Sequence, residues 1–323
     1  MGTRERLLRL LEDNRDRYLS GEKMAAQLGV SRNAVWKAVN ALRAEGYCID
    51  AVTNRGYALS QESDLLSPQA IESRLPPGHP FSVSVRKQVD STNEEARRRA
   101  LEGAPEGTVV AAESQTAGKG RQGKRFFSPS ESGVYLSVVL RPETTAERGQ
   151  LITCGAAVAC AQAIERVTGR KALIKWVNDI YCDGRKVAGI LTEGAVDMES
   201  GRFDYVVLGI GVNVKPPSGG FPESIAGTAG ALLDNGQPAV RNELAAEMLQ
   251  GFWSLYERLP TCDFHDEYRR RCFLLGEHVV VSHAGSRVRA RAVDLTDDFK
   301  LVIELPSGER RELPCGEAST SRA

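Results

Sequence analysis

The first sixty residues place their apolar side chains at helical spacing. The run "RLLRLL" predicts an amphipathic helix, and "SGEKMAAQLGVSRNAVWKAVNALRAEGY" contains two more helical stretches separated by "LGVS". Gly29 permits a tight turn there and Ser31 is a suitable N-cap, while Val35, Val39 and Leu42 form the inward stripe of the last helix. The segment "CIDAVTNRGYAL" then alternates around a turn, which predicts the hairpin of a winged helix-turn-helix.

The outward face of that last helix is polar. It carries side chains able to reach base edges and phosphates from a DNA major groove: Arg32, Asn33, Trp36, Lys37 and Asn40. Turn, cap, polar face and wing occur in the order expected of a DNA-binding unit. A small three-helix packing module is the alternative, because Val, Ala and Leu at this spacing form a core in either case.

After the polar segment "SQESDLLSP" the pattern changes to short apolar strands mixed with helical stretches, from Val83 to about residue 260. Their hairpin-like spacing predicts an α+β domain with a mixed, largely antiparallel sheet. Beyond "YRRRC", short strands joined by turns predict a small C-terminal β-barrel. We therefore expect a multidomain chain divided at 1–64, 65–272 and 273–323.

Composition narrows the functional classes only a little. The formal net charge is zero, so any binding of nucleic acid must depend on a local patch. The seven cysteines are scattered without a C-x-x-C pair, which favours reduced thiols in the cytoplasm and gives no support for a zinc site. The N-terminus lacks an apolar signal core, and no apolar run approaches the roughly 20 residues of a membrane span. We expect a cytoplasmic protein with no membrane partner.

The stretch "GKGRQGKR", residues 118–125, completes a G-x-G-x-x-G fingerprint, but its context is wrong for a dinucleotide site. Pro129 and Gly133 follow, and the next element reads as a strand rather than a helix. The glycines therefore indicate a flexible loop. Its cations, Lys119, Arg121, Lys124 and Arg125, have no acidic neighbour within the loop, which favours an anionic ligand over a merely solvated surface.

Further polar residues stand beside apolar strands. Ser91, Thr92 and Asn93 lie where a strand gives way to a helix, although Ser91 or Thr92 could simply be its N-cap. "IKWVNDIYCDGRKVAGIL" embeds charged residues in strands; a plain hairpin explains its turn formers but not Lys186, which must pair with an anion or face solvent. The other candidates are Gln115, Lys175, Asn178, Asp179, Gly209, Gly211 and Asn213.

Taken in order, these motifs identify a resemblance. With "GKGRQGKRFFSP" and "KWVNDIYCDGRKVAGIL" as its most specific stretches, the chain resembles bacterial biotin protein ligases of the bifunctional kind that also repress the biotin operon. The resemblance covers nearly the whole length and implies an SH3-like C-terminal barrel. It also implies that ATP and Mg2+ activate biotin to biotinyl-5′-adenylate. The biotinyl group then passes to a lysine of the biotin carboxyl carrier protein of acetyl-CoA carboxylase.

The resemblance assigns roles residue by residue. Lys186 matches the lysine that contacts the biotin carboxyl group, Asp179 would orient it, and Arg121 matches the arginine that retains the adenylate, with Lys119 near the same anion. The remaining biotin-binding matches are Ser91, Thr92, Asn93, Gln115, Gly189 and Gly209. Those implied for the nucleotide, besides Arg121, are Phe126, Lys175, Asn178 and Asn213.

Partners and alternatives follow from the same comparison. Carrier protein, operator DNA and a homodimer of the adenylate-bound form are implied. The chain departs from the family pattern at Val177, Phe126 and Lys119, where proline, tryptophan and arginine are common. A lipoate-type ligase and a non-catalytic biotin-responsive regulator are the alternatives; the DNA-binding head argues against the first, and the presence together of Lys186, Asp179 and Arg121 argues against the second.

Overall fold

The computed structural model describes residues 2–15, 17–238, 240–259, 261–283, 286–313 and 318–322. Its N-terminal unit has its own apolar core, in which Val35, Val39 and Leu42 are buried as predicted. Ser31 caps the third helix by accepting a hydrogen bond from the Ala34 amide, and Gly29 has a positive φ of 65°. The predicted winged helix-turn-helix is confirmed as α1 (Thr3–Glu12), α2 (Gly21–Leu28), α3 (Arg32–Ala44) and the hairpin of β1 (Ile49–Val52) and β2 (Gly56–Leu59).

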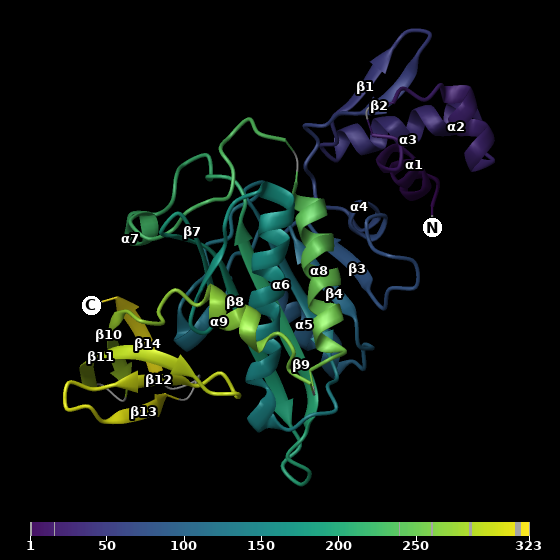
Figure 1. The fold of residues 1–323 in the computed structure, drawn as a ribbon. Helices are drawn as coiled ribbons and strands as arrows, with labels where there is room; N and C mark the ends of the chain where they lie inside the picture. Colours follow the sequence, from purple (N-terminus) through teal and green to yellow (C-terminus); the bar gives the residue numbers. More distant parts are fainter. Residues whose placement is uncertain are drawn as a thin grey trace.

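The central unit is built on a seven-stranded sheet (Figure 1). Its strands β3 and β4 are parallel, and the other neighbouring pairs are antiparallel, which confirms the predicted mixed sheet. In spatial order the strands are β3 (Ser82–Arg86), β4 (Thr108–Ala112), β5 (Gly133–Leu140), β9 (Phe203–Asn213), β8 (Arg185–Val196), β7 (Asp179–Cys182) and β6 (Leu173–Lys175).

Helices cover both faces of this sheet. Alternate residues of β4 point in opposite directions: Val109 and Ala111 pack into the main core with α6 and α8, whereas Val110 packs with Ala96 and Ala100 of α5. Helix α6 has the length and composition of a membrane span, yet 67% of that stretch is buried inside the protein. The helices are α4 (Pro68–Glu72), α5 (Thr92–Leu101), α6 (Gln150–Thr168), α7 (Glu223–Ala226), α8 (Arg241–Tyr256) and α9 (His265–Arg271), with short 3₁₀ turns η1 (Arg121–Gly123) and η2 (Ala146–Arg148).

The C-terminal unit consists of the short strands that the sequence predicted, and they pair as a five-stranded antiparallel sheet where a small barrel was expected. It is anchored to the central unit by Phe299, whose ring contacts Tyr268 of α9 and whose carbonyl accepts the Trp176 indole N–H at 2.8 Å. The predicted domain boundaries stay predictions. The strands lie in the order β13 (Arg310–Leu313), β12 (Leu301–Glu304), β11 (Ser286–Leu295), β10 (His278–His283) and β14 (Ala318–Arg322).

Candidate functional site

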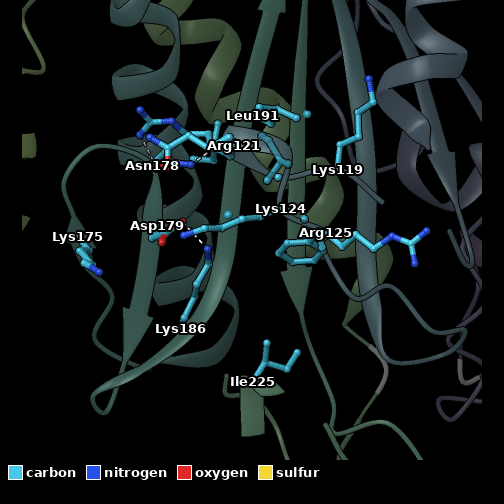
Figure 2. Close-up of a pocket in the computed structure, with 18 of the residues that line it drawn as sticks. Lys119, Arg121, Lys124, Arg125, Lys175, Asn178, Asp179, Lys186, Leu191 and Ile225 are labelled. Carbon is cyan, nitrogen blue, oxygen red and sulfur yellow. Dashed lines mark hydrogen bonds and ion pairs between the residues drawn. The ribbon is translucent and has the colours of Figure 1, made fainter. Parts of the chain in front are cut away.

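A cavity of about 560 Å³ lies against the central sheet, where the polar motifs of the sequence come together. Its walls come from the start of α5, the 118–126 loop, the β6–β7 and β8 segments and the glycine-rich part of β9. The C-terminal sheet also contributes, through Val280, Ser282 and Arg287, which sequence reasoning had not assigned to the site. Segments from two of the three units therefore line one site. Figure 2 shows residues that the central unit contributes.

Lys186 and Asp179 form an ion pair on the wall of this cavity, with 2.6 Å between Nζ and Oδ1. The β7–β8 hairpin brings them together, because its tight turn uses positive φ values at Asp183 and Gly184. The ammonium and carboxylate are about one-third and one-fifth exposed, so a ligand can reach both. This pairing answers the question raised by a lysine inside an apolar strand: it has an acidic partner and faces the cavity.

Two further lysines surround that pair. Figure 2 shows Lys124 extending towards Asp179, whereas its neighbour Arg125 points away. Burial lowers the pKa of Lys175, and the positive charges of Lys186 and Lys124 lower it further, while Asp179 opposes them. Lys124 was recognised as a loop cation but not as a site residue. In an extended loop, neighbouring side chains such as those of Lys124 and Arg125 point in opposite directions, and this was the only signal that could have distinguished the two. Three lysines around one carboxylate make this a site for anions.

Arg121 closes the loop over the cavity. Its guanidinium donates to the Asn178 side-chain oxygen at 3.2 Å, and the Asn178 amide in turn donates to the Ile190 carbonyl at 2.6 Å. The next residue, Gln122, has a positive φ of 55°, and the Gly120 amide bonds the Lys124 carbonyl at 2.7 Å to complete a tight turn. The 118–126 loop, called the flap below, therefore carries Arg121 to the Asn178–Asp179 turn.

Lys119 also lines the cavity, and its expected place near the adenylate anion stays a prediction. Its ammonium pairs with Glu94 of α5 and lies 3.5 Å from a carboxylate oxygen of Glu193 on β8. The hydrogen bond to Glu94 raises the pKa of Lys119. In Figure 2 its side chain points away from Lys186. The sequence argument counted acidic residues only within the loop, and both partners are distant in sequence.

Replacing Lys119 by Met should therefore change ligand affinity less than about fivefold, because a partly exposed ion pair contributes only about 0–1 kcal/mol. The measurement is calorimetric titration of biotin into wild type and variant. The matched change Arg121→Met should weaken binding of the same ligand more than Lys119→Met does. Equal losses in the two variants would contradict this placement.

The opposite end of the cavity is neutral and rich in hydrogen-bonding groups. Gln115 accepts from the Thr92 backbone N–H at 2.8 Å and donates to the Ser128 hydroxyl at 2.7 Å. Buried Ser137 of β5 donates to Thr92 and Asn93, at 2.8 and 2.6 Å. Ser91 occupies the N-cap position of α5, but its side chain makes no capping bond. Ser137 was missed, because a lone serine within an apolar strand gives no recognisable signal.

Glycines bring the backbone of β8 and β9 close to this region. A Cβ on Gly209 would lie 1.9 Å from Asn93 Oδ1, and one on Gly211 would lie 2.7 Å from the Phe126 ring. Gly189 is also on the wall, 3.4 Å from Phe126 and Lys186 by the same measure. Side chains at Gly209 and Gly211 would displace residues that line the cavity.

Asn213 lies outside the cavity wall. Its side-chain amide donates to the Gly230 carbonyl at 3.0 Å, so here it holds the segment that follows α7. Among the described residues, no group of three His, Cys, Asp or Glu side chains is arranged to hold a metal ion.

The predicted DNA-contacting residues lie on α3. Arg32, Asn33 and Lys37 are exposed, Asn40 is partly exposed, and Trp36 is 54% exposed despite its large apolar ring. Figure 1 shows α3 and the β1–β2 hairpin together at one end of the molecule. The structure therefore presents the polar face of this helix and the wing on an accessible part of the molecule.

Comparison with known proteins agrees with the structure of the N-terminal and central units. Residues 85–213 match the "Biotin/lipoate A/B protein ligase family" and residues 3–58 match an "HTH domain". A relative from Bacillus spizizenii, "Bifunctional ligase/repressor BirA", is 33% identical over 319 residues, covering 95% of this chain and 96% of that protein. A "Biotin--[acetyl-CoA-carboxylase] ligase" from Mycobacterium tuberculosis is 31% identical, covering 69% of this chain and 83% of its own length.

Solved structures show the same similarity. The biotin protein ligase from Aquifex aeolicus, in complex with biotin and ATP, superposes with a TM-score of 0.63 at 26% identity, covering 75% of this chain and 99% of that one. With a near full-length relative, a winged head and a ligase-type cavity, the chain belongs to the family of bifunctional ligase/repressor BirA proteins, which are biotin ligases with a DNA-binding repressor domain.

Proposed function

We propose that this chain joins the carboxylate of biotin to the α-phosphate of ATP and releases pyrophosphate, and that it then transfers the biotinyl group to a carrier lysine. The acceptor would be the biotin carboxyl carrier protein of acetyl-CoA carboxylase. The observation that carries this proposal is the Lys186–Asp179 pair under the Arg121 flap, with a neutral polar pocket at the other end of one cavity.

The charges of the site suit the first step. A carboxylate oxygen must approach a phosphorus that carries negative oxygens, so the reactants repel one another until cations hold both. Lys186 would bind the biotin carboxylate, while Lys124 and Arg121 would hold the α-phosphate. As the new C–O–P bridge forms, the bond to the pyrophosphate oxygen breaks, and the electron pair leaves with pyrophosphate.

Asp179 has two proposed roles. Its carboxylate fixes the Lys186 ammonium at 2.6 Å, so that the cation is already in place when the substrate binds. In the second step the carrier lysine attacks the acyl carbon, the bond to the adenylate oxygen breaks, and AMP leaves. The attacking amine must lose a proton, and Asp179 is the only carboxylate among the described residues that line the cavity.

Magnesium fits this site as a nucleotide-held ion. Mg2+ prefers one or two carboxylates together with substrate phosphates and waters, and the cavity offers Asp179 as its carboxylate. When bound, the ion would neutralise phosphate charge. The protein's own residues would bind and orient the two reacting groups.

The neutral end of the cavity fits the head of biotin. The ureido group carries N–H donors and a carbonyl acceptor, and Ser91, Thr92, Asn93 and Gln115 offer both kinds of partner. At the nucleotide end, the Phe126 ring packs over Gly211 and provides an apolar surface against which adenine could pack. Closure of the flap would also exclude water from the mixed anhydride, which otherwise hydrolyses.

We also propose that α3 reads operator DNA from the major groove. The adenylate-bound protein would dimerise through its central domain, so that two heads span two half-sites in the cytoplasm. The carrier protein and a second protomer would then compete for binding to the adenylate-bound protein. The accessible polar face of α3 and its neighbouring wing support this proposal.

Two substitutions on α3 should distinguish contacts to DNA phosphates, which affect binding to any DNA sequence, from contacts to bases, which affect binding to the matched sequence. Lys37→Ala should weaken binding to the chain's own biotin-operon promoter about equally for matched and scrambled sequences, lowering the salt slope by about 1. Asn33→Ala should cost about 1–3 kcal/mol on the matched sequence alone. The measurement is fluorescence anisotropy across a salt series, with Lys87→Ala on the central domain as the control. Identical salt slopes for Lys37→Ala and wild type would exclude this placement.

Adenylate formation is tested by biotin-dependent exchange of labelled pyrophosphate into ATP, with lipoate as the competing acid. Exchange with biotin that is lost on omitting Mg2+ is the expected result. Biotin binding without exchange would leave a ligand-responsive regulator, and exchange with lipoate in place of biotin would change the substrate.

A further inference from the structure

Arg241, the first residue of α8, is a fully buried arginine outside the cavity. Its side chain is 1% exposed, and it is the largest fully buried side chain in the described chain. Removing a guanidinium from water costs several kcal/mol, so its charge needs nearby partners. Its Nε has no hydrogen-bond partner among the described residues and lies 3.5 Å from Asp64 Oδ2, whereas both Nη atoms donate hydrogen bonds. Its partners therefore show which segments it holds together.

One set of partners lies at the base of the flap. Arg241 donates from Nη1 to Glu113 at 2.8 Å and to the Gly133 carbonyl at 3.2 Å. Glu113 directly follows β4, and Gly133 is the first residue of β5. The segment between these two residues includes Gln115 and the 118–125 loop. Both of its ends are therefore bound by the same guanidinium.

The other set of partners lies in the linker that follows the DNA-binding head. Arg241 donates to the Asp64 carbonyl oxygen through Nη2, and its backbone N–H donates to Asp64 Oδ1 at 3.0 Å. The second Glu113 oxygen accepts the Leu66 amide at 2.6 Å. Asn242, the next residue on α8, binds the Leu65 carbonyl and the Ser67 amide. Residues 64–67 are thus held by the groups that hold the flap.

The linker is in turn tied to the head. Arg15, just after α1, donates to the Ser63 carbonyl at 3.0 Å and pairs with buried Glu12 at 2.7 Å. Arg74, after α4, reaches the same Glu12 carboxylate at 3.6 Å. Polar contacts therefore run from the flap base, through buried Arg241 and the linker, to the first helix of the DNA-binding unit, where Arg15 and Arg74 are partly exposed.

We propose that Arg241 is a positioning residue that couples the base of the ligand flap to the linker of the DNA-binding head. Ordering of the flap by ligand then stabilises the linker, and, because coupling between sites is reciprocal, a fixed linker favours ligand binding. The proposal rests on the ligand site proposed above. It adds a route inside one protomer by which ligand occupancy reaches the head.

The direct test is hydrogen exchange of the full chain with and without biotin plus ATP. Ligand should slow exchange in the 118–126 flap and also at the amides of residues 64–67. Protection of the flap with unchanged exchange at 64–67 would overturn the coupling but leave the ligand site intact. Protection of neither segment would overturn the proposed function as well.

Arg241→Lys keeps the charge but replaces the planar, forked guanidinium, whose two Nη atoms reach Glu113 and Asp64, by a single ammonium group. We expect the biotin KM to rise about tenfold with kcat within about threefold, and the ligand-induced protection of 64–67 to be lost. Arg166→Lys is the matched control. Arg166 of α6 pairs on the surface with Glu247 of α8, the helix that begins with Arg241, away from the flap and the linker. Equal KM values in the two variants would contradict a positioning role.

A second variant keeps the test valid if Arg241→Lys fails to fold. Asp64→Ala removes the carboxylate that accepts the Arg241 backbone N–H and leaves the bonds to Glu113 and Gly133. The expected result is a biotin KM within about twofold of wild type, with a smaller ligand effect on exchange at 64–67. A full ligand effect on 64–67 in this variant would place the coupling elsewhere.

Discussion

Lys186→Ala should lower kcat/KM for biotinylation by about 100- to 1000-fold, the cost typical of losing one preorganised electrostatic contact to a developing charge. The substitution removes the ammonium that we place on the biotin carboxylate, and it leaves Asp179 without its ion-pair partner on the cavity wall. Two like charges, the substrate carboxylate and Asp179, would then face each other. The measurement is steady-state transfer of labelled biotin to a carrier domain.

Lys171→Ala is the matched control, since Lys171 is an exposed lysine near β6. It should leave kcat/KM within about twofold of wild type, as a surface substitution usually does. Lys186→Arg should retain part of the activity, because charge is kept while reach and geometry change. A Lys186→Ala variant as active as the Lys171→Ala control would remove Lys186 from the reaction.

Gly209→Ala should weaken biotin binding by roughly 10- to 100-fold, which corresponds to the 1–3 kcal/mol cost of overpacking a filled site. The added methyl would lie 1.9 Å from Asn93 Oδ1. Asn93 cannot move away easily, because Ser137 and Glu193 hold its amide at 2.6 and 2.9 Å. Biotin affinity is measured by calorimetry. The melting temperature is measured in parallel, to separate a loss of affinity from a loss of stability.

Gly219→Ala is the control for this substitution. A Cβ at Gly219 meets nothing within 4 Å, so the same methyl group is added in open space. Biotin affinity should be unchanged there. If Gly209→Ala bound biotin as tightly as Gly219→Ala, the neutral end of the cavity would have to be assigned to a different ligand group.

Much of the fold followed from local patterns. The caps and turns of the head, such as Ser31 and Gly29, are short-range features, and alternation along the strands predicted the mixed sheet. The cavity was also foreseeable in outline, because strand ends and glycines bring Gln115, Lys186 and Gly209 to one surface.

The remaining features depend on contacts between distant segments. Lys119 pairs with Glu94 and Glu193, partners that no count within the loop could reveal. Asn213 bonds the Gly230 carbonyl from a segment distant in sequence, and its role at the nucleotide stays a prediction. Arg241 appears in the sequence as an ordinary charged residue at a helix start, and only folding shows that it is buried.

The central claim is that this cavity activates biotin and passes it to a carrier lysine. Its most direct test is ATP-dependent incorporation of labelled biotin into a purified biotin carboxyl carrier domain, with unlabelled lipoate as competitor and Lys186→Ala alongside. We predict incorporation that needs ATP, resists lipoate and is lost in the variant. Tight biotin binding without incorporation into the carrier would contradict the assignment.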